Sequence, residues 1–303
     1  MTEYAPYELT SDGFELVSTE VSGPVGTAIV HHRAHRGSPV ATIFIHGAAG
    51  SWTTWSPLLR AARESGVELG ELVLIDLPGW GGGRLLDPSP SLDAICDVVR
   101  DAALRLGYTE WAVVGHSMGG FLALHLAVTD PERVHSVTMV SGTTFSVIES
   151  VEHPLTRFRT LPGFVALWQV MKLLSRLGSG GRAFVGALAR VGLLRPAVFP
   201  LFRHPWRVGR SVIDALGREL RPASFVAATD IVRNYDTSAW TAVTCPVTAI
   251  KGDRDVFVRD DDLDRLREVV SQARTIVVPD CGHFAAVERP FEVIEAMRPS
   301  GDE

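Results

Sequence analysis

Ser117 lies at the centre of the segment Gly115-His-Ser-Met-Gly119, which has the spacing Gly-x-Ser-x-Gly. The segment follows an apolar run at Trp111–Val114 and precedes a segment of helical period at Phe121–Val128. A strand should therefore turn sharply into a helix at the serine, with glycines where larger side chains would collide. The pattern predicts a nucleophilic serine held above a sheet, and a chance glycine-rich turn is the alternative.

His283 is the preferred partner for this serine among the ten histidines of the chain. A serine hydroxyl is a weak nucleophile and needs a base that accepts its proton. His283 follows the apolar run Thr275–Val278, in the loop after the last expected strand. A lone loop histidine is usually a solvated side chain, but the order of the strands favours His283 as the base.

Two carboxylates in the loop after Val247–Ile250 compete for the role of the acid that orients the base. Asp255 is the first choice and Asp253 is the alternative. The chain order serine, acid, histidine is then Ser117, Asp255, His283. All three residues follow strands, and open parallel sheets place their sites at these carboxyl ends.

The segment His46-Gly-Ala-Ala-Gly50 follows the expected strand Val40–Ile45. A tetrahedral oxyanion needs backbone N–H donors that point at it. We expect these donors to be the N–H groups of Ala48 and Met118. His46 is interpreted as a residue that shapes the loop and not as a second base.

The elements that position these residues alternate along the chain. Two segments near the start, Phe14–Val21 and Thr27–His32, predict a β-hairpin. Short apolar runs then predict buried strands at Val40–Ile45, Glu71–Ile75, Trp111–Val114, Val134–Val140, Val247–Ile250 and Thr275–Val278. Segments of helical period lie between them and predict helices at Trp55–Glu64, Ser91–Leu106, Phe121–Val128 and Asp261–Val270. This alternation predicts an α/β fold with one mostly parallel sheet flanked by helices.

The alternation stops between residues 143 and 240, where prolines separate short helical stretches. We expect a helical cap at 143–240, inserted into a core formed by 1–142 and 241–303. Phe164, Leu167, Trp168, Met171 and Leu174 predict one helical stripe, and Ser179–Gly181 is expected to break that helix. The insertion has a net charge of +7 and the rest of the chain −13. A solvated basic face is the preferred interpretation, and steering of an anionic substrate is the alternative.

Composition excludes several classes of protein. The net charge of −6 and the pI near 5.9 do not favour nucleic acid as a partner. No run of about 20 apolar residues predicts stable membrane insertion, and the polar N-terminal segment does not resemble a signal peptide. Three widely spaced cysteines match neither a disulfide framework nor a zinc site, which predicts a reducing compartment and a cytoplasmic location.

Taken together, these motifs resemble the α/β-hydrolase superfamily, in particular its cap-bearing serine esterases. The resemblance runs from about Thr42 to Met297 and is carried by His46-Gly47, Asp76-Leu-Pro-Gly-Trp-Gly81, Gly115–Gly119, Gly252-Asp-Arg-Asp255 and Gly282-His283. It implies hydrolysis of a small-molecule acyl substrate through an acyl-enzyme, without a metal or organic cofactor. It also favours Asp255, three residues after a glycine, over Asp253.

The substrate is less well defined by the sequence. Relatives usually continue the Asp76 segment with histidine and a small polar residue, where this chain has Gly82-Gly83. Trp80, His116 and Phe284 are candidates for the substrate pocket, although Trp80 is equally compatible with packing. The apolar insertion favours a hydrophobic acyl group of small or medium size. Hydrolysis of a C–C bond, amide or lactone, acyl transfer, and a ligand-binding sensor on the same fold are the alternatives.

Overall fold

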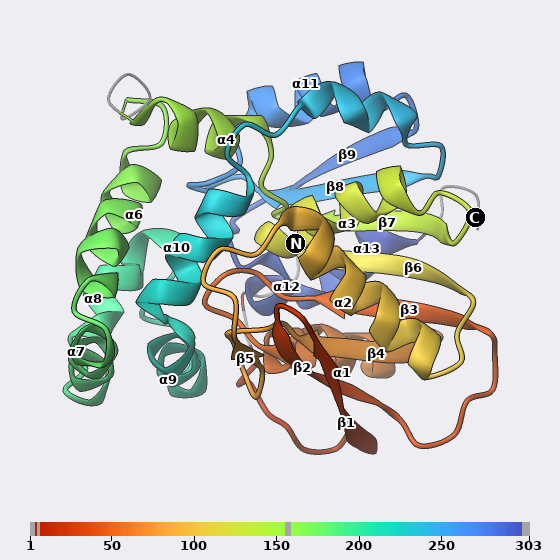
Figure 1. Ribbon diagram of the computed structural model, residues 1–303, viewed down its shortest axis with the longest axis horizontal. Helices are drawn as coiled ribbons and strands as arrows, with labels where there is room; N and C mark the ends of the chain where they lie inside the picture. The colour runs from red at the N-terminus through yellow and green to blue at the C-terminus, as the bar shows by residue number, and fades with distance from the viewer. Residues whose placement is uncertain (1–3, 5–6, 155–158, 299–303) are drawn as a thin grey trace.

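The computed structural model describes Tyr4, residues 7–154 and residues 159–298, and its strands form a single sheet (Figure 1). The order across the sheet is β1-β2-β4-β3-β6-β7-β8-β9, and β5 pairs with β2. Their bounds are β1 Leu16–Gly23, β2 Gly26–Arg33, β3 Val40–Ile45, β4 Glu71–Asp76, β5 Arg84–Leu85, β6 Glu110–His116, β7 Val134–Val140, β8 Val247–Gly252 and β9 Ala273–Val278. The predicted hairpin is β1 and β2, while the two-residue β5 was not predicted.

The six neighbouring strands β4, β3, β6, β7, β8 and β9 run parallel to one another, which confirms the mostly parallel sheet. In the centre, Ile45 of β3 is in register with Gly115 of β6, and Val140 of β7 with Ile250 of β8. This register brings the carboxyl ends of β3, β6, β7 and β8 to one edge of the sheet. The loops that carry His46, Ser117 and Asp255 therefore start side by side.

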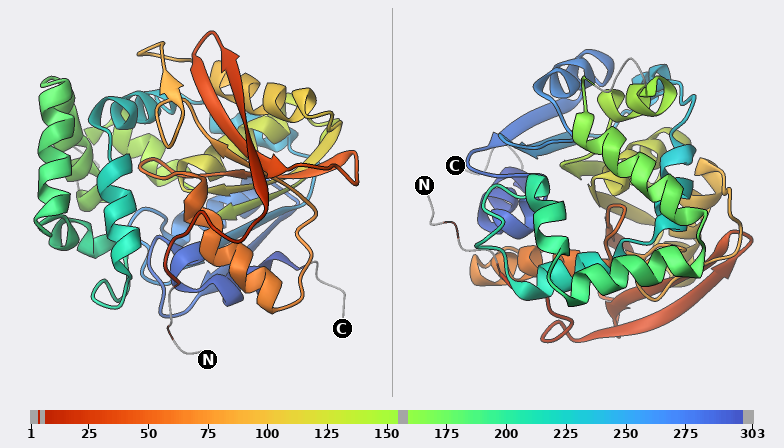
Figure 2. Two further views of the ribbon diagram at one scale, coloured as in Figure 1. Left: turned by 90° about the horizontal axis from the view of Figure 1, so that it is seen from below. Right: turned by 90° about the vertical axis from the view of Figure 1, so that its left-hand side faces the viewer.

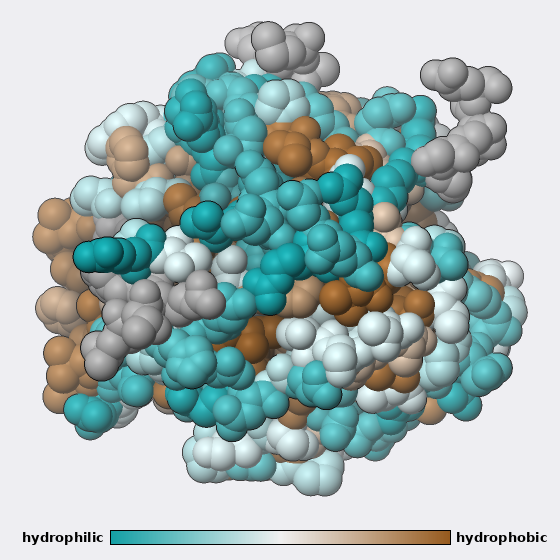
Figure 3. Space-filling view, turned by 90° about the horizontal axis from the view of Figure 1, so that it is seen from above, coloured by the Kyte–Doolittle hydropathy of each residue, from teal (hydrophilic) through white to brown (hydrophobic). Residues whose placement is uncertain are grey.

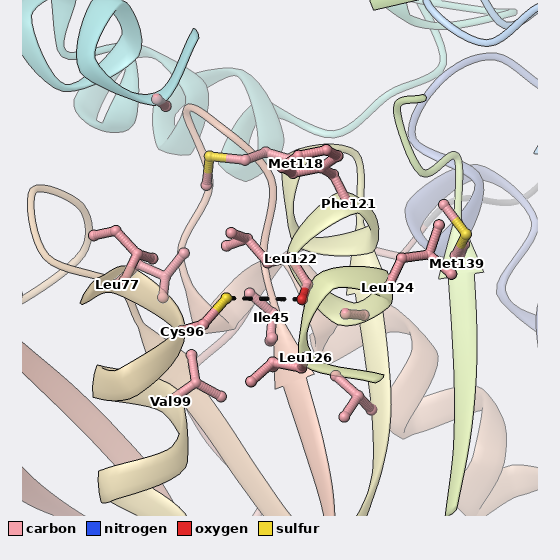
Figure 4. Close-up of a cluster of buried hydrophobic side chains, with 14 of the residues drawn as sticks. Ile45, Leu77, Cys96, Val99, Met118, Phe121, Leu122, Leu124, Leu126 and Met139 are labelled. Carbon is pink, nitrogen blue, oxygen red and sulfur yellow. Dashed lines mark hydrogen bonds between the residues drawn. The ribbon is translucent and has the colours of Figure 1, made fainter. Parts of the chain in front are cut away.

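Helices cover both faces of the sheet. One face is covered by α2 (Leu92–Arg105), α3 (Met118–Thr129) and α11 (Asp260–Val269), and the other by α1 (Ser56–Glu64), α12 (Ala285–Glu288) and α13 (Pro290–Met297). Side chains alternate between the faces, so Ile45 of β3 packs under α2 and α3 while Phe44 packs under α1. Figure 4 shows Cys96 of α2 against Leu122 of α3 above Ile45. The helix α3 is buried along almost its whole length, which holds its first residues firmly at the sheet edge.

The segment between β7 and β8 is helical and stands at one side of the sheet (Figures 1 and 2). We call its helices the inserted helices: α4 Phe145–Glu152, α6 Pro162–Ser175, α7 Ser179–Arg190, α8 Leu194–Val198, α9 Arg210–Glu219 and α10 Pro222–Ile231. Arg157, which contributes to the net charge of +7 of the insertion, lies outside the described residues. Among the described residues, no helix has the length and apolar content that crossing a membrane requires.

The expected helix break at Ser179–Gly181 is wrong in position. The predicted stripe lies on α6, which ends at Ser175, and Ser179 to Gly181 form the first turn of α7. The break lies at Gly178, whose φ of 54° is in the left-handed region. Gly181 is needed inside the second helix because a Cβ there would lie 2.1 Å from Leu174 O. Gly181 therefore serves the packing of α7 against α6.

Candidate active site

Ser117 occupies the turn between β6 and α3. Its φ of 52° is in the left-handed region, which non-glycine residues rarely adopt. The turn is held from both sides, because Ser117 N–H donates to Val140 O (3.1 Å) and Ser117 O accepts from Thr143 N–H (3.1 Å). The helix predicted from Phe121 begins at Met118, directly after the serine. The N-terminus of α3, with its unpaired N–H groups and positive dipole end, thus faces the position above Ser117.

Close packing around this turn explains the glycines of the motif. A Cβ on Gly119 would lie 2.1 Å from Ile45 O, far inside any contact distance. We expect Gly119→Ala to lower the free energy of unfolding by about 3 kcal/mol, because the backbone of β3 or α3 would have to move. Gly186→Ala is the matched control, since no atom lies within 4 Å of the added methyl in α7. It should raise the free energy of unfolding by about 0.5 to 1 kcal/mol. Urea unfolding of both variants tests this, and equal midpoints would contradict it.

His283 and Asp255 are brought together from the loops after β9 and β8. His283 Nδ1 lies 2.9 Å from Asp255 Oδ1, and both side chains are almost fully buried. Asp255 Oδ1 also accepts from Phe257 N–H (2.8 Å) and Val258 N–H (3.1 Å). Burial alone would raise the pKa of the Asp255 carboxyl, but the charge and hydrogen bond of His283 and these N–H groups lower it. An ionised Asp255 fixes the Nδ1–H tautomer of His283 and leaves Nε2 as a proton acceptor.

The alternative acid, Asp253, does not contact His283. Its Oδ1 accepts from Cys281 N–H (3.0 Å), so its carboxylate ties the β8 loop to the β9 loop. Ser117 and His283 line the same cavity, although no hydrogen bond joins their side chains in the described part of the chain. Cys281 is buried, and burial raises the pKa of its thiol, so the thiol stays protonated.

The backbone of the His283 loop is held from three directions. His283 N–H donates to Leu201 O (2.8 Å) beside the inserted helices, and His116 Nε2–H donates to His283 O (3.1 Å). Burial, with the nearby His283, lowers the pKa of His116 to about 3, so this ring is neutral. The third contact comes from α12, where Glu288 Oε1 accepts from Gly282 N–H (3.0 Å). His116 therefore connects the serine turn directly to the histidine loop.

Glu288 is a buried carboxyl that the sequence patterns did not reveal. It accepts from Arg203 N–H (2.8 Å), Tyr4 O–H (2.9 Å) and Gly282 N–H, so it joins the inserted segment and the N-terminal segment to the His283 loop. Burial raises its pKa from 4.5 to about 7 despite these donors. The folded state therefore binds this proton more tightly than the unfolded state does.

This proton predicts a pH-dependent stability. The contribution of protonated Glu288 is present below pH 4.5 and is lost as the pH rises through about 7. Relative to Glu288→Gln, the free energy of unfolding of the wild type should fall by on the order of 2 kcal/mol between pH 5 and pH 8. Urea titrations at both pH values measure this difference. Glu295→Gln, which removes an exposed carboxylate from α13, is the control. Parallel pH profiles for wild type and Glu288→Gln would contradict the prediction.

The loop after β3 approaches Ser117 closely. A Cβ on Gly47 would lie 2.8 Å from Ser117 Cβ, so only glycine allows this approach. The turn that follows is closed by Gly50 N–H to Gly47 O (3.1 Å), with Ala49 at a φ of 62°. Ala48 and Met118, the two expected oxyanion donors, both line the cavity beside Ser117. His46 is fully buried, accepts from Leu77 N–H at Nε2 (3.1 Å), and thus shapes the loop as expected.

Trp80 was a candidate for the substrate pocket, and its side chain lies elsewhere. It is 4% exposed, packs 6.0 Å from the His46 ring, and does not line the cavity that contains Ser117. Its loop is held by Asp76, which accepts from Trp52 N–H (2.7 Å) and Gly82 N–H (3.0 Å). Arg221 donates to Gly79 O (3.0 Å) and Gly81 O (2.7 Å) of the same loop. Trp80 therefore packs where the inserted helices meet the core.

The cavity above Ser117 has a volume of about 400 Å³. Its floor contains His116, Ser117 and His283, and its walls come mainly from the inserted helices. The candidates His116 and Phe284 line it, and the two rings pack 4.8 Å apart. No charged side chain of Asp, Glu, Lys or Arg lines it among the described residues. The cavity therefore favours an apolar group next to the serine.

Two residues near His283 were not identified from the sequence. The Phe257 ring packs edge-on 4.7 Å from the His283 ring and lines the cavity. Thr143 follows β7 and lines the cavity at the serine turn. Proximity to Asp255 was the only sequence signal for Phe257, and Thr143 had none.

The sequence and the fold of this chain are similar to those of known proteins. A sequence model of the alpha/beta hydrolase family matches residues 42–296. A pimeloyl-[acyl-carrier protein] methyl ester esterase of Nitrosomonas europaea is 28% identical, over 84% of this chain and 93% of the relative. An esterase of Mycobacterium tuberculosis is 27% identical, over 86% and 83% of the two chains. A thermophilic esterase from Thermogutta terrifontis superposes with a TM-score of 0.68 at 18% identity, over 93% of this chain and 96% of that chain.

Proposed function

The chain belongs to the alpha/beta hydrolase family, and from this starting point we propose that it hydrolyses esters with Ser117 as nucleophile, His283 as general base and Asp255 as the orienting acid. The observation that carries the proposal is the contact of 2.9 Å between His283 Nδ1 and Asp255 Oδ1. His283 lies on the floor of the apolar cavity that also contains Ser117. The two esterase relatives support the ester as the substrate bond.

The reaction begins when Ser117 Oγ attacks the ester carbonyl and His283 Nε2 accepts its proton. Ionised Asp255 stabilises the imidazolium that forms. The N–H groups of Ala48 and Met118 donate to the tetrahedral oxyanion. His283 then protonates the leaving alcohol, which leaves an acyl group on Ser117. A water activated by His283 releases the acid and restores the serine.

Residues 143–240 act in this proposal as a cap over a core of 1–142 and 241–303. The cap helices supply most of the apolar cavity wall, so they select the acyl group, while the core loops supply the reacting groups. The volume of about 400 Å³ supports a small or medium hydrophobic acyl chain. The three cysteines are unpaired and buried, which supports the reducing, cytoplasmic location that we propose.

A chain-length series of p-nitrophenyl esters tests the substrate proposal. We expect kcat/KM to rise from acetate to a medium chain and then to fall when the cavity is filled. Leu167→Trp narrows the cavity from α6 and should move the optimum to shorter chains. Gln169→Trp adds an indole to the exposed side of the same helix and is the control. A series without hydrolysis would contradict the ester proposal, and an optimum at acetate would contradict this cavity as the acyl site.

A further inference from the structure

The segment between β7 and β8, which carries the inserted helices, exposes an unusual number of large apolar side chains. Among the described residues, thirteen large apolar side chains are exposed, and eight of them lie between residues 170 and 206. They are Val170, Leu173, Leu177, Phe184, Val191, Leu193, Phe199 and Trp206. In Figure 3, brown side chains gather at the left edge, the side on which Figure 1 places α6 and α7. Apolar clustering of this kind marks an interaction surface.

Their spacing forms stripes on two neighbouring helices. Val170 and Leu173 lie three residues apart on the outer side of α6, and Leu177 follows four residues later in the turn directly after this helix. Their exposed fractions are 50%, 60% and 61%. Phe184 of α7 and Val191, the residue directly after this helix, are seven residues apart and form a similar stripe. The inner sides of both helices are already buried in the cavity wall, so these outer stripes have no partner within the described chain.

The charges of this segment all have one sign. Residues 153–213 contain ten Arg and Lys residues and no Asp or Glu. A solvated face normally mixes both signs, whereas here exposed Arg176 borders the stripe of α6 and exposed Arg190 that of α7. Arginines beside apolar side chains are typical of surfaces that lie on anionic lipid.

The cavity opens through the same side chains. Val170 and Phe184 line the cavity and are also 50% and 53% exposed, which places them at its mouth. Exposed Gly163, Ala166 and Pro200 line it as well. An acyl chain that enters there passes directly from the apolar stripes to the floor that contains Ser117.

We propose that this apolar and cationic face docks on an anionic lipid surface and takes an acyl ester from it into the cavity. The face is defined by Val170, Leu173, Leu177, Phe184 and Val191 with Arg176 and Arg190. The proposal rests on the proposed esterase function and adds the physical state of its substrate. Docking leaves the chain at the interface, because the apolar side chains reach only the boundary between head groups and acyl chains.

A dimer of this chain is a poorer occupant of the face. In a symmetric dimer the same patch meets itself, so Arg176 and Arg190 would face a second set of arginines without a carboxylate from residues 153–213 to pair with. Anionic head groups supply that missing negative charge, and acyl chains cover the stripes. Charge complementarity therefore favours lipid over self-association.

Vesicle flotation with the full chain tests the docking. Vesicles of ether-linked phosphatidylglycerol and phosphatidylcholine carry no carboxylic ester, so binding is measured without turnover by an esterase. We expect the partition coefficient to be about tenfold higher for vesicles that contain phosphatidylglycerol than for vesicles of phosphatidylcholine alone. Binding to phosphatidylglycerol should also fall with added salt. Leu173→Ser with Leu177→Ser should lower it about tenfold or more, and Arg176→Glu with Arg190→Glu should do the same. Leu104→Ser on α2 and Arg267→Glu on α11 are exposed controls outside the face and should bind like wild type.

Activity measurements separate failure of docking from failure of the esterase proposal. None of the four residues changed in the face lines the cavity. Both double variants should therefore hydrolyse soluble p-nitrophenyl butyrate like wild type and lose about tenfold in rate on a long-chain ester embedded in phosphatidylglycerol vesicles. Intact butyrate hydrolysis without vesicle binding by wild type would overturn the docking proposal alone. The docking proposal would also be overturned if both double variants kept wild-type vesicle binding. It would be overturned as well if the wild type were a dimer in solution and Leu173→Ser with Leu177→Ser made it a monomer.

Discussion

Ser117→Ala should lower kcat for ester hydrolysis by about 10⁴-fold or more, the largest effect expected of any single substitution in this chain. The variant removes the only atom of the turn that can form the acyl-enzyme, while the oxyanion donors and the apolar cavity remain. These remaining groups leave a small residual rate above that of water. Initial rates on the preferred p-nitrophenyl ester, wild type beside variant at equal concentration, measure the difference.

Two control measurements distinguish loss of the nucleophile from misfolding of the variant or contamination by another esterase. The variant should unfold at the urea concentration of the wild type or slightly above it, because the strained φ of 52° at Ser117 persists in both proteins. A fluorophosphonate should phosphonylate Ser117 Oγ with loss of fluoride, which adds the phosphonyl mass to the Ser117 peptide of wild type, and should leave the variant unlabelled. Wild-type rates in a folded, unlabelled variant would show that another group is the nucleophile.

Asp255→Asn should lower kcat by about 10³- to 10⁴-fold, and this variant distinguishes the two carboxylates that compete in the sequence. The amide carries no charge, so it cannot stabilise the imidazolium that forms at the contact of 2.9 Å, even where its oxygen still accepts from His283 Nδ1–H. The N–H groups of Phe257 and Val258 still find an oxygen acceptor, so the loop should keep its conformation. The effect should therefore appear in kcat and not in the free energy of unfolding.

Asp253→Asn is the matched control for this result. It makes the same replacement of one carboxylate oxygen by an NH₂ group in the same loop, but Asp253 accepts from Cys281 N–H and does not contact the histidine. An asparagine oxygen still accepts from that N–H, so the rate should fall by less than about tenfold. Equal losses in both variants would mean that loop geometry, and not the charge beside His283, controls the rate. A larger loss in Asp253→Asn would make Asp253 the acid.

Local patterns determined the fold class well because buried parallel strands have a composition of their own. The bounds of β3 agree with the apolar run Val40–Ile45, since such strands are covered on both faces and tolerate few polar residues. The position of the helix break was predicted wrongly because glycine both ends helices and allows close packing inside them. Ser179–Gly181 has the composition of a helix break, but close packing of α7 against α6 requires its glycine at 181.

The sequence by itself determined which groups follow which strands, and hence that Ser117, Asp255 and His283 should meet at one edge. The spacing from Gly252 favoured Asp255 over Asp253, but only the tertiary structure showed which carboxylate contacts the histidine, because the two lie two residues apart in one turn. It also decided that Trp80 packs behind the loop, that Glu288 supports the His283 loop, and that Arg221 holds a loop 140 residues away. Contacts of this kind are set by how separate elements pack against one another, and a pattern read along one element contains no record of them.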